Sequence, residues 1–114
     1  MSISAPSTAK GKLENTFPKR HLFLRNTMQI SVYDTYVQRP DGCRMHFDIL
    51  VPSELKDHDT ILQHGRTYLA AKGLHPAELK AEKCRYCHIE LATSQVGKEV
   101  AERGFAVLEM ENCA

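Results

Sequence analysis

The sequence predicts an α+β domain in two layers, a four-stranded sheet with two helices, in the order strand, strand, helix, strand, helix, strand. Three observations predict it. Two segments of alternating apolar and polar residues flank a turn at 39–42. Two later segments, around 57–72 and 93–103, carry apolar residues at helical spacing. A last apolar segment, 105–110, follows a glycine that can end the second helix.

The first two strands are expected at 28–37 and 43–51, joined by the type I turn Arg39-Pro40-Asp41-Gly42. We prefer the register in which Gln38 faces Cys43, because it gathers the long apolar residues on one face. Asp34 then falls on that apolar face. The grouped residues are Ile30, Val32 and Tyr36 with Met45, Phe47, Ile49 and Val51. The opposite face would carry Ser31, Tyr33, Thr35, Arg44, His46 and Asp48.

Capping residues and glycines set the bounds of the two expected helices. Asp57 or Asp59 can begin the first helix, and Gly73 can end it. Thr93 or Ser94 can begin the second. We expect both helices on one face of the sheet.

The last two strands complete the expected fold. A third strand is expected at Leu79–Tyr86, leading into a cysteine-rich motif. The last strand, Phe105–Met110, is apolar on both faces, which predicts a central position in the sheet. The expected core comprises Ile30, Val32, Phe47, Ile49, Leu69, Val100, Val107 and Leu108.

Charge and composition divide the chain into a tail, residues 1–27, and a single domain, residues 28–114. The tail carries five basic residues and one acidic residue and sustains no amphipathic period, so we expect it to be disordered. No apolar run approaches the roughly 20 residues of a membrane span. The domain lacks the basic stripe of a nucleic-acid-binding protein. We therefore expect a soluble cytoplasmic protein without a membrane or nucleic-acid partner.

The pentapeptide Cys84-Arg85-Tyr86-Cys87-His88 is the strongest chemical signal in the sequence. Two cysteines separated by two residues can bind a metal ion, exchange electrons as a dithiol, or accept a haem by thioether linkage. They can also be reduced thiols that only pack at the end of a strand. For a zinc ion we prefer the ligand set Cys84, Cys87, Cys113 and His46.

The polar face of the expected hairpin supplies a second candidate site. Tyr33, Thr35, His46 and Asp48 would stand side by side there, and His88 is a further candidate. A histidine beside an aspartate and a hydroxyl group can perform general acid–base chemistry. The alternative is a solvated sheet face, on which these residue types are common.

Several motifs resemble a family of small bacterial proteins, the domain-of-unknown-function family numbered 2024. They are Val32-Tyr33-Asp34-Thr35-Tyr36-Val37, Asp41-Gly42, Met45-His46-Phe47-Asp48, the cysteine pentapeptide and the terminal Cys113. The likeness runs from Met28 to the C-terminus. It implies a compact cytoplasmic α+β domain and supplies no activity.

Two classes of function follow from the sequence. One is a thiol-bearing or zinc-stabilised interaction module, with an exposed sheet face for a partner or for self-association. The other is a small enzyme that uses His46 and Asp48, or the dithiol of Cys84 and Cys87. The short chain and the lack of a large cofactor motif favour the module.

Overall fold

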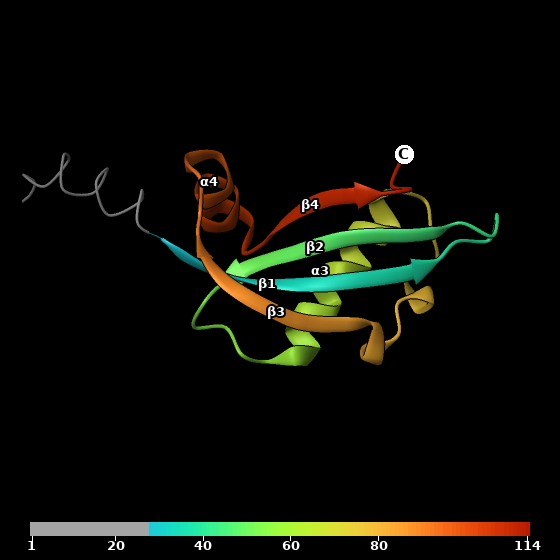
Figure 1. Ribbon diagram of the computed structural model, residues 1–114, viewed down its shortest axis with the longest axis horizontal. Coiled ribbons are helices and arrows are strands. Elements are labelled where there is room, and N and C mark those ends of the chain that lie inside the picture. Colours follow the sequence, from blue (N-terminus) through green and yellow to red (C-terminus); the bar gives the residue numbers. More distant parts are fainter. Residues whose placement is uncertain (1–27) are drawn as a thin grey trace, which may run out of the picture.

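The computed structural model describes residues 28–114, and the expected tail lies outside the described residues. The chain forms strands β1 (Gln29–Gln38) and β2 (Arg44–Pro52), then helix α3 (His58–Ala71). Two short 3₁₀ turns precede β3 (Cys84–Leu91), helix α4 (Ser94–Arg103) and β4 (Ala106–Glu111). The predicted fold class, a four-stranded sheet with two helices in this order, is confirmed (Figure 1). No helix of this described part is long and apolar enough to cross a membrane.

The sheet is antiparallel throughout, with the strand order β3-β1-β2-β4. The hairpin strands β1 and β2 therefore lie at the centre, and β3 and β4 form opposite edges. The predicted central position of the last strand is wrong. Leu108 and Met110 on β4 are about half exposed, at 49% and 50%. Strand β4 is therefore an edge strand with an exposed apolar side, and the apolar pattern alone does not distinguish such a strand from a buried one.

The two helices pack on opposite faces, so the expectation of a single covered face is wrong. Helix α3 covers Met45, Phe47, Ile49 and Val51 along the length of β2. Helix α4, through Val96 and Val100, packs with Ile30, Val32 and Leu50 near one end of the sheet (Figure 1). These residues alternate along the strands with those under α3, and successive side chains of a strand point to opposite faces.

The hairpin register differs by one residue from the expected one, because Gln38 pairs with Arg44 and not with Cys43. The turn explains the difference. Gly42 donates to the Arg39 carbonyl at 3.0 Å and has a φ of 91°, while the Arg39 amide donates to the Cys43 carbonyl at 2.9 Å. A type I turn followed by a left-handed glycine adds a bulge residue to the loop. The shift turns Tyr33, Thr35 and Val37 toward α3 and moves Asp34 out of the core.

The third strand begins five residues later than expected. Residues Pro76–Glu78 and Ala81–Lys83 form the 3₁₀ turns, and Leu79 between them is buried against the α3 side of the core. The Cys84–His88 motif consequently lies inside β3, along a bulge opposite Val32 and Tyr33. The bulge sets the directions of the motif's side chains.

The core agrees with most of the expected residues. Ile30, Val32, Phe47, Ile49, Leu69 and Val100 are buried. Val107 is partly buried, and Leu108 is outside the core because α4 covers only one end of its face. Helix α3 is also fixed to β4 by Glu109, which accepts a hydrogen bond from Tyr68 and pairs with Lys72 at 2.7 Å.

Candidate metal centre

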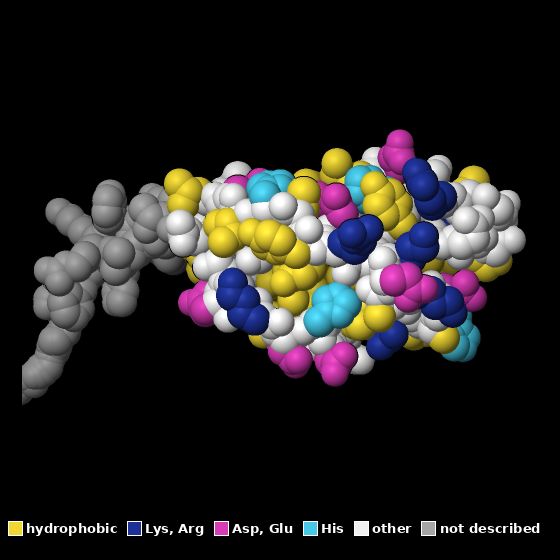
Figure 2. Space-filling model, turned by 60° about the horizontal axis from the view of Figure 1, so that its bottom comes forward, with side chains coloured by type: hydrophobic (Ala, Val, Ile, Leu, Met, Phe, Trp, Pro, Cys, Tyr) yellow, Lys and Arg dark blue, Asp and Glu magenta, His cyan; other side chains and the backbone are white. Residues whose placement is uncertain are grey.

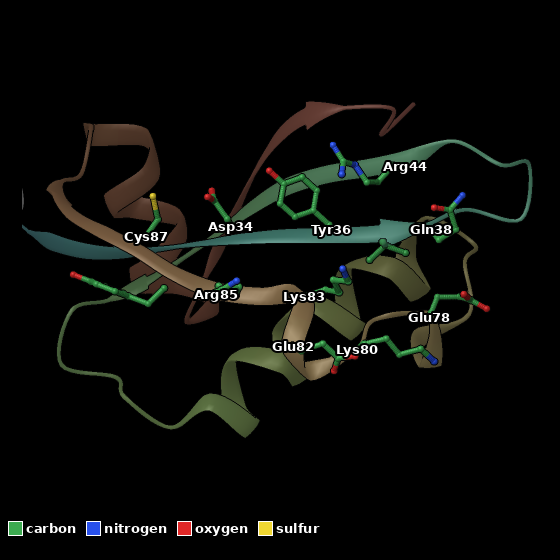
Figure 3. Close-up of a pocket in the computed structure, with 12 residues that line it drawn as sticks. Asp34, Tyr36, Gln38, Arg44, Glu78, Lys80, Glu82, Lys83, Arg85 and Cys87 are labelled. Carbon is green, nitrogen blue, oxygen red and sulfur yellow. The ribbon is translucent and has the colours of Figure 1, made fainter.

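Three side chains of types that can bind a metal ion meet on the sheet face opposite α3. Asp34 pairs directly with Asp48 across β1 and β2, and His46 lies two residues before Asp48 on β2. Alternation along each strand places the three side chains on the same face. One oxygen or nitrogen atom from each lies within 4.8 Å of those of the other two. Figure 3 shows Asp34 on the side of the sheet away from α3.

Two of the facing atoms are buried without a hydrogen-bond partner, His46 Nε2 and Asp48 Oδ1. His46 Nε2 lies 3.6 Å from Asp48 Oδ1 and 3.7 Å from Asp34 Oδ1. These separations lie within ion-pair range for a protonated histidine but are too long for direct hydrogen bonds. Buried polar atoms are nearly always paired, so an unpaired facing set needs an explanation such as an ion between them.

The electrostatics of the three residues also favour a cation. Burial, and then the neighbouring Asp34 carboxyl, raise the pKa of Asp48 to about 6. The charge of His46 opposes the rise. Two carboxyl groups held this close disfavour simultaneous ionisation unless a positive charge lies between them.

Aromatic packing fixes the histidine. Tyr36 pairs with His46 across the strands, and their rings stack at 4.3 Å with an interplanar angle of 16°. The guanidinium of Arg44 lies over the Tyr36 ring, 4.7 Å from its centre. The imidazole is therefore positioned before any ligand binds, which lowers the cost of ordering a metal ligand.

Cys87 and His88 adjoin the three residues from β3. Partial desolvation, and then the charges of Asp34 and Asp48, raise the pKa of the Cys87 thiol. His88 Nδ1 lies 3.1 Å from Cys87 Sγ, and His88 Nε2 lies 2.8 Å from Glu90 Oε1. The exposed thiol is thus held at the rim of the site (Figure 3).

The four ligands preferred from the sequence are not brought together. Cys84 points toward α3, where the Thr35 hydroxyl donates to its sulfur at 3.6 Å, whereas Cys87 adjoins Asp34 on the other face. Cys113 follows β4 at the opposite edge, and its thiol donates to the His46 carbonyl at 3.3 Å. Of the four, only His46 and Cys87 lie at the candidate centre.

The second predicted site is divided in the same way. Tyr33 and Thr35 are buried on the α3 side, and the Tyr33 ring packs edge-on against Tyr86 at 5.7 Å. His46 and Asp48 lie on the other face. The residue that joins them there is Asp34, which the expected register placed on the apolar face. The signal that could have found it is Gly42, because a bulged turn shifts Asp34 opposite Asp48.

The donor set and its spacing fit a divalent ion such as zinc. Two ligands at about 2.0–2.2 Å from a tetrahedral zinc lie about 3.3–3.6 Å apart. The observed separations of 3.6 and 3.7 Å are close to these values. A nitrogen, two carboxylate oxygens and an adjoining thiol are all ligands that zinc accepts.

The fold and this cluster define a small α+β protein with a polar centre on an open sheet face. The chain belongs to the family described as Domain of unknown function (DUF2024), whose model matches residues 28–110. It is similar to protein NE1680 from Nitrosomonas europaea, solved by NMR, at 36% identity and a TM-score of 0.67. That similarity covers 76% of this chain and 100% of the other. A search of curated proteins finds no match.

Proposed function

We propose that this protein is a small zinc-binding module whose ion is held by Asp34, His46 and Asp48. The observation that carries the proposal is the pair of buried unpartnered atoms, His46 Nε2 and Asp48 Oδ1, that face each other at 3.6 Å. A cation between them would satisfy both atoms and neutralise the two carboxylates.

Cys87 supplies a fourth ligand in this proposal. Its thiol adjoins Asp34, and the same carboxylates that hold it protonated in the free protein would lose their effect once an ion binds. When the thiol binds zinc as a thiolate, its proton is released to solvent. The sequence-based expectation of zinc is thereby kept, with a different ligand set.

Zinc titration of the metal-free protein tests the proposal. We expect one zinc ion to bind per chain. We expect Asp34→Asn to weaken zinc binding by at least about 10-fold, because the loss of a residue that only hydrogen-bonds to a ligand already costs about that much, and Asp34 is a direct ligand in this proposal. The Asp34 side chain is 40% exposed, so the variant should fold. Calorimetry measures the affinity.

Asp59→Asn is the matched control for this titration, since Asp59 is exposed in the first turn of α3. It should bind zinc like the native protein. Equal affinities of the native protein and Asp34→Asn would refute the site.

The second candidate function is self-association, and the edge strand β3 favours it. Tyr86, Ile89 and Leu91 are 54%, 44% and 60% exposed, and their partners Tyr33, Ser31 and Gln29 place all three on the α3 side of the sheet. Figure 2 shows apolar side chains gathered on part of this surface. An unpaired edge with apolar side chains can join that of a second copy.

We expect the native chain to show concentration-dependent dimerisation and Ile89→Lys to abolish it, because a lysine would place its charge in the joined surface. Sedimentation velocity measures the change. Leu108→Lys, an equally exposed position on the other edge strand, is the control and should dimerise normally. Dimers that persist in Ile89→Lys would rule out the β3 edge.

A further inference from the structure

A pocket of about 780 Å³ opens beside the candidate metal centre. Asp34 and Cys87 line the end that it shares with the centre, and Tyr36 and Gln38 continue along β1 (Figure 3). The two 3₁₀ turns and the start of β3 form its other side. A molecule in this pocket would reach both the metal centre and the side chains of the turns.

Three basic residues of the pocket have no carboxylate partner in the described part of the chain. Arg44, Lys83 and Arg85 line the pocket, and none of them forms an ion pair with a carboxylate among residues 28–114. Register places Arg85 opposite Asp34 and Arg44 opposite Gln38, so both lie on the pocket side of the sheet. Figure 2 shows several Lys and Arg side chains on this part of the surface, with Asp and Glu side chains among them.

Apart from Asp34, the acidic residues of the pocket lie farther from the candidate centre than Lys83 and Arg85 do (Figure 3). Glu78 and Glu82 belong to the 3₁₀ turns, as does Lys83, and Figure 3 shows Lys83 and Arg85 closer than the two glutamates to β1 and Asp34. Asp34 is a ligand in the proposed zinc site, so a bound ion would cancel its charge. Lys83 and Arg85 would then supply the charge at the end of the pocket next to the centre.

We propose that this pocket binds a phosphate monoester, with its phosphate held by Lys83 and Arg85 next to the metal ion. The inference rests on the proposed zinc site. Guanidinium groups recognise phosphate oxygens through two parallel hydrogen bonds, and a lysine adds a point charge. Arg44 and the Tyr36 ring below it would contact the organic part of the ester. A phosphate dianion pairs with Lys83 and Arg85 together better than a singly charged carboxylate does.

Phenyl phosphate is the probe, titrated into the zinc-loaded full chain and followed by amide chemical shifts. We expect saturable binding with shifts at residues 83–87. The double variant Lys83→Gln/Arg85→Gln should weaken binding by at least about 10-fold, because charge-assisted hydrogen bonds are the strong ones. Both side chains are exposed, so the variant should keep the fold. Lys98→Gln, an exposed position on α4, is the control and should bind like the native chain.

Three results would overturn the inference. They are no saturable binding to zinc-loaded protein, equal binding by the double variant, and equal or tighter binding of benzoate. Failure of the zinc proposal is seen separately, as the absence of zinc binding before any phosphate is added. In that case phenyl phosphate is titrated into the metal-free native chain and into the metal-free double variant. Equal binding by the two proteins would reject the pocket as well.

Discussion

Phe47→Ala is expected to lower the free energy of unfolding by about 3–5 kcal/mol, the usual cost of removing a buried phenyl ring. Phe47 is 0% exposed, at the centre of the sheet under α3, and its ring lies 4.6 Å from that of Tyr68. The loss combines the transfer of the ring from water with the cavity that it leaves. Denaturant unfolding measures it.

Leu108→Ala is the comparison for this experiment. Leu108 belongs to the same sheet, but it is 49% exposed on an edge strand. We expect its loss to cost below about 1 kcal/mol, because little apolar surface returns to water. Equal costs for the two variants would contradict the burial that separates the core from the edge.

The face that β2 presents to the core could be predicted from the sequence, and the face that β1 presents could not. The strict alternation of Met45, Phe47, Ile49 and Val51 predicts a buried side of β2, and all four are buried. Strand β1 has apolar residues on both faces, because α4 covers Ile30 and Val32 while α3 covers Val37. The apolar pattern of β1 therefore cannot fix the register, which the turn decides.

The candidate centre shows the same limit. His46 and Asp48 could be identified from their spacing on one strand, whereas Asp34 depends on a single-residue shift in pairing. The direction of Cys87 depends on the bulge in β3. The separation of Cys113 from the cysteine pair depends on which edge β4 occupies. Each of these is set by contacts between segments distant in sequence, which local patterns do not contain.

Asp48→Asn is expected to remove zinc binding and, in the same protein, to stabilise the metal-free fold at pH 7. The pKa of Asp48 is raised to about 6 in the folded chain from its ordinary value of 3.8. Folding therefore favours the protonated carboxyl. The stability that this provides is present below pH 4 and is lost as the pH rises through 6. At pH 7 the metal-free native protein holds an unfavourable charge that asparagine lacks.

The expected gain at pH 7 is about 1–2 kcal/mol, reduced from the full linkage value because solvent near the site screens part of the effect. At pH 4 the carboxyl of the native protein is mostly protonated, so the two proteins should differ less. Thermal unfolding across this range, without metal, measures the difference. An Asp48→Asn variant that is less stable at pH 7 would mean that Asp48 holds the fold together. A more stable variant that no longer binds zinc would mean that Asp48 is retained for the ion at a cost in stability.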